Sequence, residues 1–194
     1  MKNIISDIRH TIVVTIIGAV VLCGIYPLVV YGIGQLAFPY QANGSLIKAK
    51  DGTILGSEML GQPFASDKYF NSRPSAAGTG YDATSSGGTN LGPTSQKLHD
   101  SVKAAVDAYR KQNGLAADAL VPADAVTSSA SGLDPHISVK NAALQIPRVA
   151  KARNLSVDQV TTLVQKYTEG RDLGVFGEAR VNVLKLNLAL DGQI

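Results

Sequence analysis

The sequence has few charged residues, and one long stretch of it has none. Its 18 Lys and Arg and its 15 Asp and Glu give a net charge of +3 over 194 residues. So small an excess does not indicate a nucleic-acid-binding protein. None of these charges and none of the three histidines lies between Thr11 and Phe38, where 20 of 28 residues are hydrophobic. Because roughly 20 apolar helical residues cross a bilayer, residues 11–38 are predicted to form one membrane-spanning helix.

The flanks of this stretch favour an uncleaved anchor over a secretion signal. The stretch is longer than the apolar core of a signal peptide and has no small-residue cleavage site near its end. Lys2 and Arg9 precede it, and no Lys or Arg follows before Lys48. Because positively charged flanks stay in the cytoplasm, residues 1–10 are predicted to be cytoplasmic and residues 39–194 to form a domain on the outer side.

Two residues within the predicted membrane helix have structural consequences. Cys23 is the only cysteine of the chain, so the predicted outer domain cannot contain a disulfide. Pro27 lacks an amide hydrogen and is expected to kink the helix, a distortion that membrane helices tolerate best beside a neighbouring helix. Pro27 is therefore a candidate contact with a partner subunit, and a plain anchor without a helical partner is the alternative.

The residues after the anchor have the patterns of a single α+β domain. Two short strands are predicted at 45–50 and 53–56, because the Asp51-Gly52 pair between them suits a tight hairpin. Alternating apolar residues at 180–190 favour a strand near the end of the chain, with an amphipathic helix as the alternative.

Three helices are predicted between these strands from apolar residues at helical spacing. The first begins near Thr94 or Ser95 and ends at Asn113-Gly114, and the second follows Ser138. Pro147 is expected to bend or split the second helix. Ser156 opens the third helix, with Gln159 completing a capping box.

A loop rich in small polar residues separates the strands from the first helix. In residues 71–95, 18 of 25 positions are Gly, Ser, Thr, Asn or Pro. A flexible linker is one interpretation. Because the segment lies inside the domain and carries Arg73, Tyr81 and Asp82, an ordered interaction loop is favoured.

Motifs for several catalytic chemistries are missing from the sequence. It has no G-x-x-x-x-G-K-[ST] phosphate loop, and no histidine stands at metal-ligand spacing from another His or Cys. The best enzyme-like cluster is Ser131, Asp134 and His136. A nucleophilic triad requires these groups to converge in space, and Asp134-Pro135 more readily forms a turn before the next helix. A membrane-anchored exported hydrolase using this cluster is the alternative function.

Five motifs are spread along the chain after the single apolar span: Gly56–Phe64, Tyr69–Ala76, Ser86–Thr94, Ser129–Ser138 and Gly177–Leu184. In this order they resemble the KdpC family, the C subunits of the bacterial Kdp potassium-transporting ATPase. The resemblance implies a non-catalytic accessory subunit in the bacterial inner membrane, needed for assembly of a pump that transports K⁺. The implied partners are a potassium-translocating A subunit, an ATP-hydrolysing B subunit and a small F subunit, besides membrane lipid.

The resemblance also implies roles for individual residues. The family is described as a catalytic chaperone that raises the ATP affinity of the B subunit, which assigns nucleotide binding to Gln145, Ser86, Gly87 and Gly88. The predicted outer location argues against direct binding of cytosolic ATP, so stabilisation of the assembly or shaping of potassium access is the alternative. We expect no metal and no cofactor of the chain's own. Candidate contacts with partner subunits are Arg73, Pro74, Ser75, Asn90, Asp134, His136 and Pro27.

Overall fold

The computed structural model describes residues Lys2–Ile194 and divides into two compact units. The first unit ends at Leu46, and the second comprises Ile47–Ile194. The α+β architecture that the sequence predicts is confirmed.

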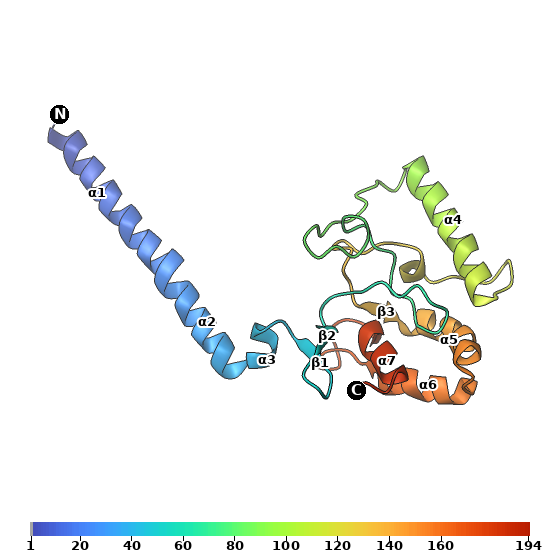
Figure 1. The fold of residues 1–194 in the computed structure, drawn as a ribbon. Helices are drawn as coiled ribbons and strands as arrows, with labels where there is room; N and C mark the ends of the chain where they lie inside the picture. Colours follow the sequence, from blue (N-terminus) through green and yellow to red (C-terminus); the bar gives the residue numbers. More distant parts are fainter. Residues whose placement is uncertain (1) are drawn as a thin grey trace. The chain divides into compact units, whose positions relative to one another are not determined.

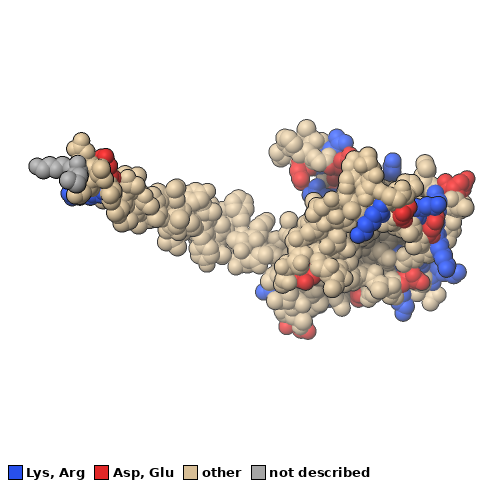
Figure 2. Space-filling model, turned by 90° about the horizontal axis from the view of Figure 1, so that it is seen from above, with Lys and Arg blue, Asp and Glu red and all other residues tan. Residues whose placement is uncertain are grey.

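The first unit is a long apolar helix that includes a π turn. Helix α1 (Lys2–Ala19) continues through the π turn Val20–Ile25 into α2 (Tyr26–Ala37), and the short α3 (Pro39–Ala42) follows. Figure 1 shows α1 and α2 running along one line, and Figure 2 shows charged side chains only near the beginning of this helix. Pro27 lies in the first turn of α2, directly after the π turn. The wider turn accommodates the missing amide, so the effect of Pro27 is a local change of helix type within a continuous rod.

This helix has the length and composition of a membrane span. Asn3–Ala37 covers 35 residues, has a mean hydropathy of 2.6 in its most apolar part, and has no side chains buried within the structure. The helix therefore extends into the predicted cytoplasmic segment and ends at Ala37, one residue before the predicted boundary. Such a length allows the helix to span a bilayer with some tilt.

The second unit begins with the predicted hairpin. Strands β1 (Leu46–Lys48) and β2 (Ile54–Ser57) pair with each other. In the turn between them, the Thr53 amide donates to the Asp51 side chain, and Gly52 has a φ of +87°. These features confirm the hairpin, because a residue at positive φ closes the turn with little strain only when it is glycine or a short polar residue.

The core of the second unit lies between helices and a three-stranded antiparallel sheet of order β3-β5-β4. The strands are β3 (His136–Ser138), β5 (Arg180–Asn182) and β4 (Thr168–Glu169), and Ile137 pairs with Val181. Helices α5 (Val139–Arg153) and α6 (Val157–Lys166) contact each other extensively, and α4 (Gln96–Asn113) contacts α5. A 3-10 turn at Ala123–Ala125 precedes β3 (Figure 1). The fully buried residues of the core cluster include Phe70, Ala142, Val149, Val160, Val181 and Leu186.

The predicted ends of the three helices are confirmed by their capping bonds. The hydroxyls of Ser95, Ser138 and Ser156 each accept the amide three residues later, and Gln159 completes the capping box of α6. Gly114 closes α4 with a left-handed conformation. Pro147 does not split α5. The helix is continuous from Val139 to Arg153, and the proline lies on its exposed side.

The preferred prediction of a strand at 180–190 was wrong for most of that segment, and its helical alternative holds. Only Arg180–Asn182 forms a strand, and α7 occupies Val183–Leu190. Asn182 ends the strand and caps the helix, because its side chain accepts the amide of Lys185. Helix α7 is largely buried, so its apolar residues occupy several faces and the one-sided helical pattern is absent from the sequence.

Candidate functional site

Residues 71–95 form an ordered loop held by hydrogen bonds to the segment before β3. The Ser75 hydroxyl donates to the carbonyl of Gly132 at 2.6 Å and accepts the amide of Tyr81 at 2.7 Å. The Tyr81 hydroxyl donates to the carbonyl of Arg73 at 2.5 Å. The loop is therefore folded on itself and attached to a second segment, which excludes the flexible-linker interpretation.

Ser86, Gly87 and Gly88 lie where this loop meets the segment at 129–132. The Gly87 amide donates to the carbonyl of Ser131 at 2.9 Å, and the Ser86 hydroxyl donates to the same oxygen at 3.0 Å. A Cβ on Gly88 would lie 3.2 Å from the carbonyl oxygen of Ala130. Gly88 thus allows two backbone segments to approach closely, whereas a Cβ on Gly87 would meet no atom within 4 Å. The amide of Gly87 is already bonded within the chain.

Gly132 is the most constrained position of this contact. Its φ is +68°, and a Cβ there would lie 2.6 Å from the amide nitrogen of Ala77 and 2.7 Å from the carbonyl oxygen of Gly87. Both neighbours are backbone atoms, so neither can turn aside. Only glycine fits at this position without a shift of the loop.

Arg73, Asp134 and His136 form a charged cluster beside the loop. Arg73 Nη1 lies 2.9 Å from Asp134 Oδ2, and the amide of His136 donates to Asp134 Oδ1 at 2.9 Å. Burial alone would raise the pKa of Asp134, but hydrogen bonds from the ring and amide of His136 and from Arg73 outweigh it and lower the pKa to about 2. Asp134 is therefore an ionised carboxylate that fixes the position of Arg73.

The cluster continues along the three-stranded sheet. His136 Nε2 lies 3.5 Å from Glu169 Oε2 on β4, and Glu169 Oε2 lies 3.3 Å from Arg180 Nε on β5. A cleft of about 500 Å³ is lined by Arg73, Asp124, Asp134, His136, Glu178 and Arg180. Alternating positive and negative side chains along this cleft give it mixed charge, which suits contact with a polar protein surface.

The cluster is not a catalytic triad. The Ser131 hydroxyl accepts the amide of Leu133 at 3.1 Å and lies 3.3 Å from the hydroxyl of Ser129. Within residues 2–194, no hydrogen bond joins Ser131 to His136, although Asp134 Oδ1 lies 3.6 Å from His136 Nδ1. Ser131 therefore organises the turn before β3, and the geometry that a serine nucleophile needs is not formed.

Gln145 lies at the centre of a buried polar network on α5. Its side-chain oxygen accepts hydrogen bonds from the amide of Asn71 at 2.8 Å and from Arg148 Nη2 at 2.7 Å. Its side-chain nitrogen donates to Asn141 Oδ1 at 2.9 Å and to the carbonyl of Asn71 at 3.3 Å. The amide of Gln145 thus has two accepted and two donated bonds, all within the chain.

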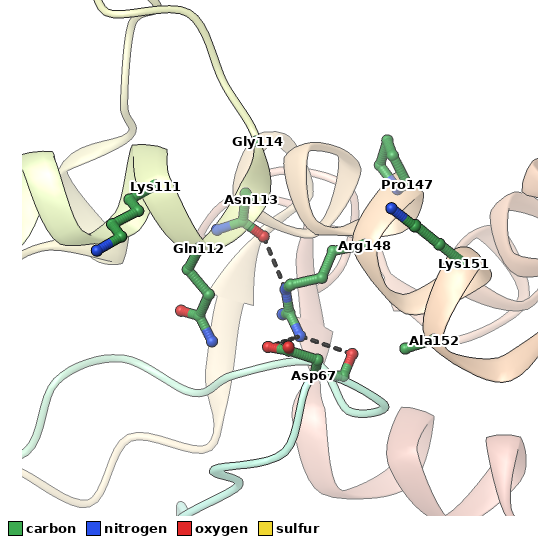
Figure 3. Close-up of a pocket in the computed structure, with 9 residues that line it drawn as sticks. All are labelled: Asp67, Lys111, Gln112, Asn113, Gly114, Pro147, Arg148, Lys151 and Ala152. Atoms are coloured by element: carbon green, nitrogen blue, oxygen red, sulfur yellow. Dashed lines mark hydrogen bonds and ion pairs between the residues drawn. The ribbon is translucent and has the colours of Figure 1, made fainter.

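Arg148 connects this network to α4 and to the segment before the loop. Figure 3 shows its guanidinium between Asn113 and Asp67, beside a cavity of about 510 Å³. Arg148 Nε donates to Asn113 Oδ1 at 2.9 Å, and Nη1 donates to the carbonyls of Asp67 and Tyr69 at 2.8 and 3.0 Å. Burial lowers the pKa of this guanidinium. The buried guanidinium of Arg148 is tolerated because its N–H groups donate hydrogen bonds to the protein, and these bonds join three parts of the chain.

Asp124 closes the other end of the network. Its carboxylate accepts the amide and the hydroxyl of Ser138 and the side chain of Asn141, all within 3.0 Å. Burial and the charge of Asp124 raise the pKa of Tyr109, whose hydroxyl donates to Asn141 Oδ1. These contacts fix the start of α5 against α4.

The remaining candidate residues lie on the surface. Pro74 is exposed at the loop, and Asn90 is exposed with a φ of +51°, a conformation that asparagine tolerates. Pro27 is exposed on the long helix of the first unit. The structure therefore gathers Arg73, Ser75 and Asp134 around one loop and leaves Pro74 and Asn90 facing solvent.

Sequence reasoning missed several residues of these networks. Asn141 and Arg148 were not singled out, although with Gln145 they repeat at intervals of four and three residues on the buried face of α5. Polar residues at that spacing on an otherwise apolar helix face are a recognisable signal of a buried network. Asp124, Glu169 and Arg180 have no such signal, because the fold alone brings them to the cluster.

The fold and the site define a membrane-anchored α+β protein whose motif residues hold loops in place. The family model described as "K+-transporting ATPase, c chain" matches residues 8–192. Potassium-transporting ATPase KdpC subunits are similar over nearly the full chain: that of Mycobacterium tuberculosis is 54% identical over 190 residues, covering 98% of each chain. The subunit of Koribacter versatilis is 50% identical over 192 residues, covering 98% of this chain and 95% of the relative. The chain belongs to the KdpC family and is a subunit of a potassium transport complex.

Proposed function

We propose that the chain is a non-catalytic subunit that docks onto the other subunits of the pump through the loop at 71–95 and the charged cluster. One observation carries the proposal: the polar groups of the loop are bonded to one another and to neighbouring segments, as in the Ser75, Gly87 and Gln145 contacts. Polar groups that are hydrogen-bonded within the chain hold the loop rigid. A rigid surface loses little conformational entropy when it binds a partner.

We further propose that the docking domain lies on the outer side of the membrane. Lys2 and Arg9 flank the beginning of the apolar helix, and its other end has no Lys or Arg before Lys48. On that side the domain can contact the potassium-translocating A subunit near its entrance. The helix would pack in the membrane beside the A, B or F subunit.

The location also decides how the chain can affect ATP. In our proposal the hydrolytic site belongs to the B subunit, and any rise in ATP affinity is an indirect result of docking. The saturated hydrogen bonds of Gln145 support this view, because a side chain with four partners inside the protein has little capacity left for a nucleotide.

The experiment compares pump complexes that carry Arg73→Gln or Asn90→Arg with a Lys103→Gln control. Arg73→Gln removes the ion pair to Asp134, and Asn90→Arg adds a long charged side chain at an exposed loop position. We expect both variants to lose subunits during purification and to lose potassium-stimulated ATPase activity. Lys103→Gln, on the exposed face of α4, should behave as the unsubstituted chain.

Folding and docking are separated by measuring the melting temperature of each variant chain. Asn90 has a φ of +51°, which arginine adopts less readily than asparagine, so Asn90→Arg is expected to lower the melting temperature slightly. Loss of the complex at a temperature where this variant chain is still folded therefore reports contact with a partner. Full subunit composition and full activity with both variants would show that this loop is not the docking surface.

A further inference from the structure

The most exposed apolar group of the second unit is a narrow turn between β4 and β5. Leu173 is 90% exposed, Val175 is 71% exposed and Phe176 is 64% exposed. We call residues 172–176 the apolar tip. Soluble domains show single exposed apolar side chains everywhere, but three within four residues on a protruding turn indicate a contact site.

The tip is held in a defined shape. The Asp172 and Phe176 backbones exchange two hydrogen bonds of 2.9 Å, and the amide of Val175 donates to the carbonyl of Asp172 at 3.2 Å. Leu173 and Gly174 both have positive φ, at 52° and 74°. Leucine is unfavourable at such a φ, where asparagine or glycine would fit better. The tip therefore keeps a large apolar side chain at its end despite a local cost.

The tip leaves the domain beside the hairpin through which the chain arrives from the membrane helix. Lys185 forms ion pairs with Glu58, directly after β2, and with Glu169, at the base of the tip. Asn182 also donates to the carbonyl of Glu58 at 2.9 Å. In Figure 1 the segment before α7 passes beside β2. Met59, next to Glu58, is a further exposed apolar residue at this end.

The connection to the membrane helix is short. Helix α2 ends at Ala37 and β1 begins at Leu46. These nine steps span at most about 30 Å even when fully extended, so the hairpin end of the domain cannot move far from the bilayer surface. An apolar group at that end is thus kept at a high effective concentration next to lipid.

The charges around the tip are balanced. Arg171 and Arg180 carry positive charge, and Asp172 and Glu178 carry negative charge. A surface that recognised anionic headgroups would need an excess of basic residues. The tip therefore offers hydrophobic contact without a preference for lipid charge.

From these observations we propose that the apolar tip inserts into the interfacial region of the bilayer, so that the domain is attached to the membrane at a second point besides its helix. The side chains of Leu173, Val175 and Phe176 would lie among the headgroups and the first acyl carbons, as apolar residues of interfacial segments do. The proposal is independent of docking to partner subunits, because it requires only this chain and lipid.

The test uses the absence of tryptophan from the chain. The full chain is reconstituted alone in lipid nanodiscs as a Leu173→Trp variant, with Leu120→Trp as the matched control. Leu120 is 91% exposed, almost the same as Leu173, but lies on the loop after α4. Both positions face solvent, so neither substitution threatens the fold, and the melting temperature of each variant is measured to check it.

We expect the emission of Leu173→Trp to shift to shorter wavelength and to be quenched at least twofold by lipids that carry bromine on the upper acyl chain. The quenching should be equal in zwitterionic and anionic nanodiscs, and Leu120→Trp should stay unquenched. Solvent-like emission of Leu173→Trp would overturn the proposal. So would a blue shift without lipid quenching, since that result assigns the tip to a protein contact. A quenched signal that appears only in the assembled pump would show that the partner subunits bring the tip to lipid, and would overturn the claim that this chain and lipid suffice.

Discussion

Replacing Gln145 by leucine tests the structural role assigned to the buried network. The substitution keeps a side chain of similar size but removes both polar atoms. It leaves the amide of Asn71 without its acceptor and removes one of the two side-chain acceptors of Arg148 Nη2. The side-chain oxygen of Asn141 and the carbonyl of Asn71 each lose the hydrogen bond that the Gln145 side chain donates to them.

The expected loss of stability follows from these orphaned groups. A buried polar group left without a partner costs about 1–3 kcal/mol, so two poorly compensated groups give about 2–5 kcal/mol. That is a large part of the roughly 5–15 kcal/mol that stabilises a typical domain. For a domain of this size, we expect the melting temperature to fall by roughly 5–15 °C.

The assay is chemical unfolding of the full chain in detergent, followed by circular dichroism. Gln165→Leu is the matched control, because Gln165 is exposed on α6 and its replacement should change stability by less than about 0.5 kcal/mol. The ATP dependence of the assembled pump is measured in parallel with both variants.

The reasoning fails if Gln145→Leu unfolds like the unsubstituted chain while the pump needs far more ATP for half-maximal activity. That pair of results would mean that the side chain acts on nucleotide and contributes little to the fold. A destabilised chain that still assembles with unchanged ATP dependence would support the structural role.

Two further predictions concern the loop and the charged cluster. Gly132→Ala should destabilise the chain by about 2 kcal/mol or more and make the loop at 71–95 more sensitive to limited proteolysis, because its Cβ would collide with backbone atoms of Ala77 and Gly87. Because the pKa of Asp134 is lowered to about 2, its contribution to stability is complete above the unfolded value near 4 and is lost as the pH falls toward 2. Unfolding between pH 6 and pH 2 should therefore show a smaller acid-induced loss in Asp134→Asn than in the unsubstituted chain.

The parts of the fold that the sequence predicted are those set by local chemistry. A serine that caps a helix acts on an amide three residues away, so Ser95, Ser138 and Ser156 mark their helices without reference to the rest of the chain. The strand prediction failed for α7 because this helix is buried on several sides. Its apolar residues therefore do not recur at the helical spacing by which a helix with one buried face is recognised.

The candidate site was predictable only in part, for a similar reason. Arg73 and Asp134 stood in separate motifs, and their pairing across 61 residues is a product of the fold. Arg148 was overlooked because a basic residue on a helix usually faces solvent. Arg148 can be buried because its guanidinium donates hydrogen bonds to Asn113, to Gln145 and to the backbone carbonyl of Asp67.

The side of the membrane on which the domain lies is the central claim, and cysteine labelling tests it most directly. In a Cys23→Ser chain, Ser85→Cys places one thiol on an exposed position of the loop at 71–95, and Ser6→Cys places one before the apolar stretch. We predict that a small membrane-impermeant thiol reagent labels Ser85→Cys in intact cells and labels Ser6→Cys only after lysis. Labelling of Ser85→Cys only after lysis would place the domain in the cytoplasm and contradict the account.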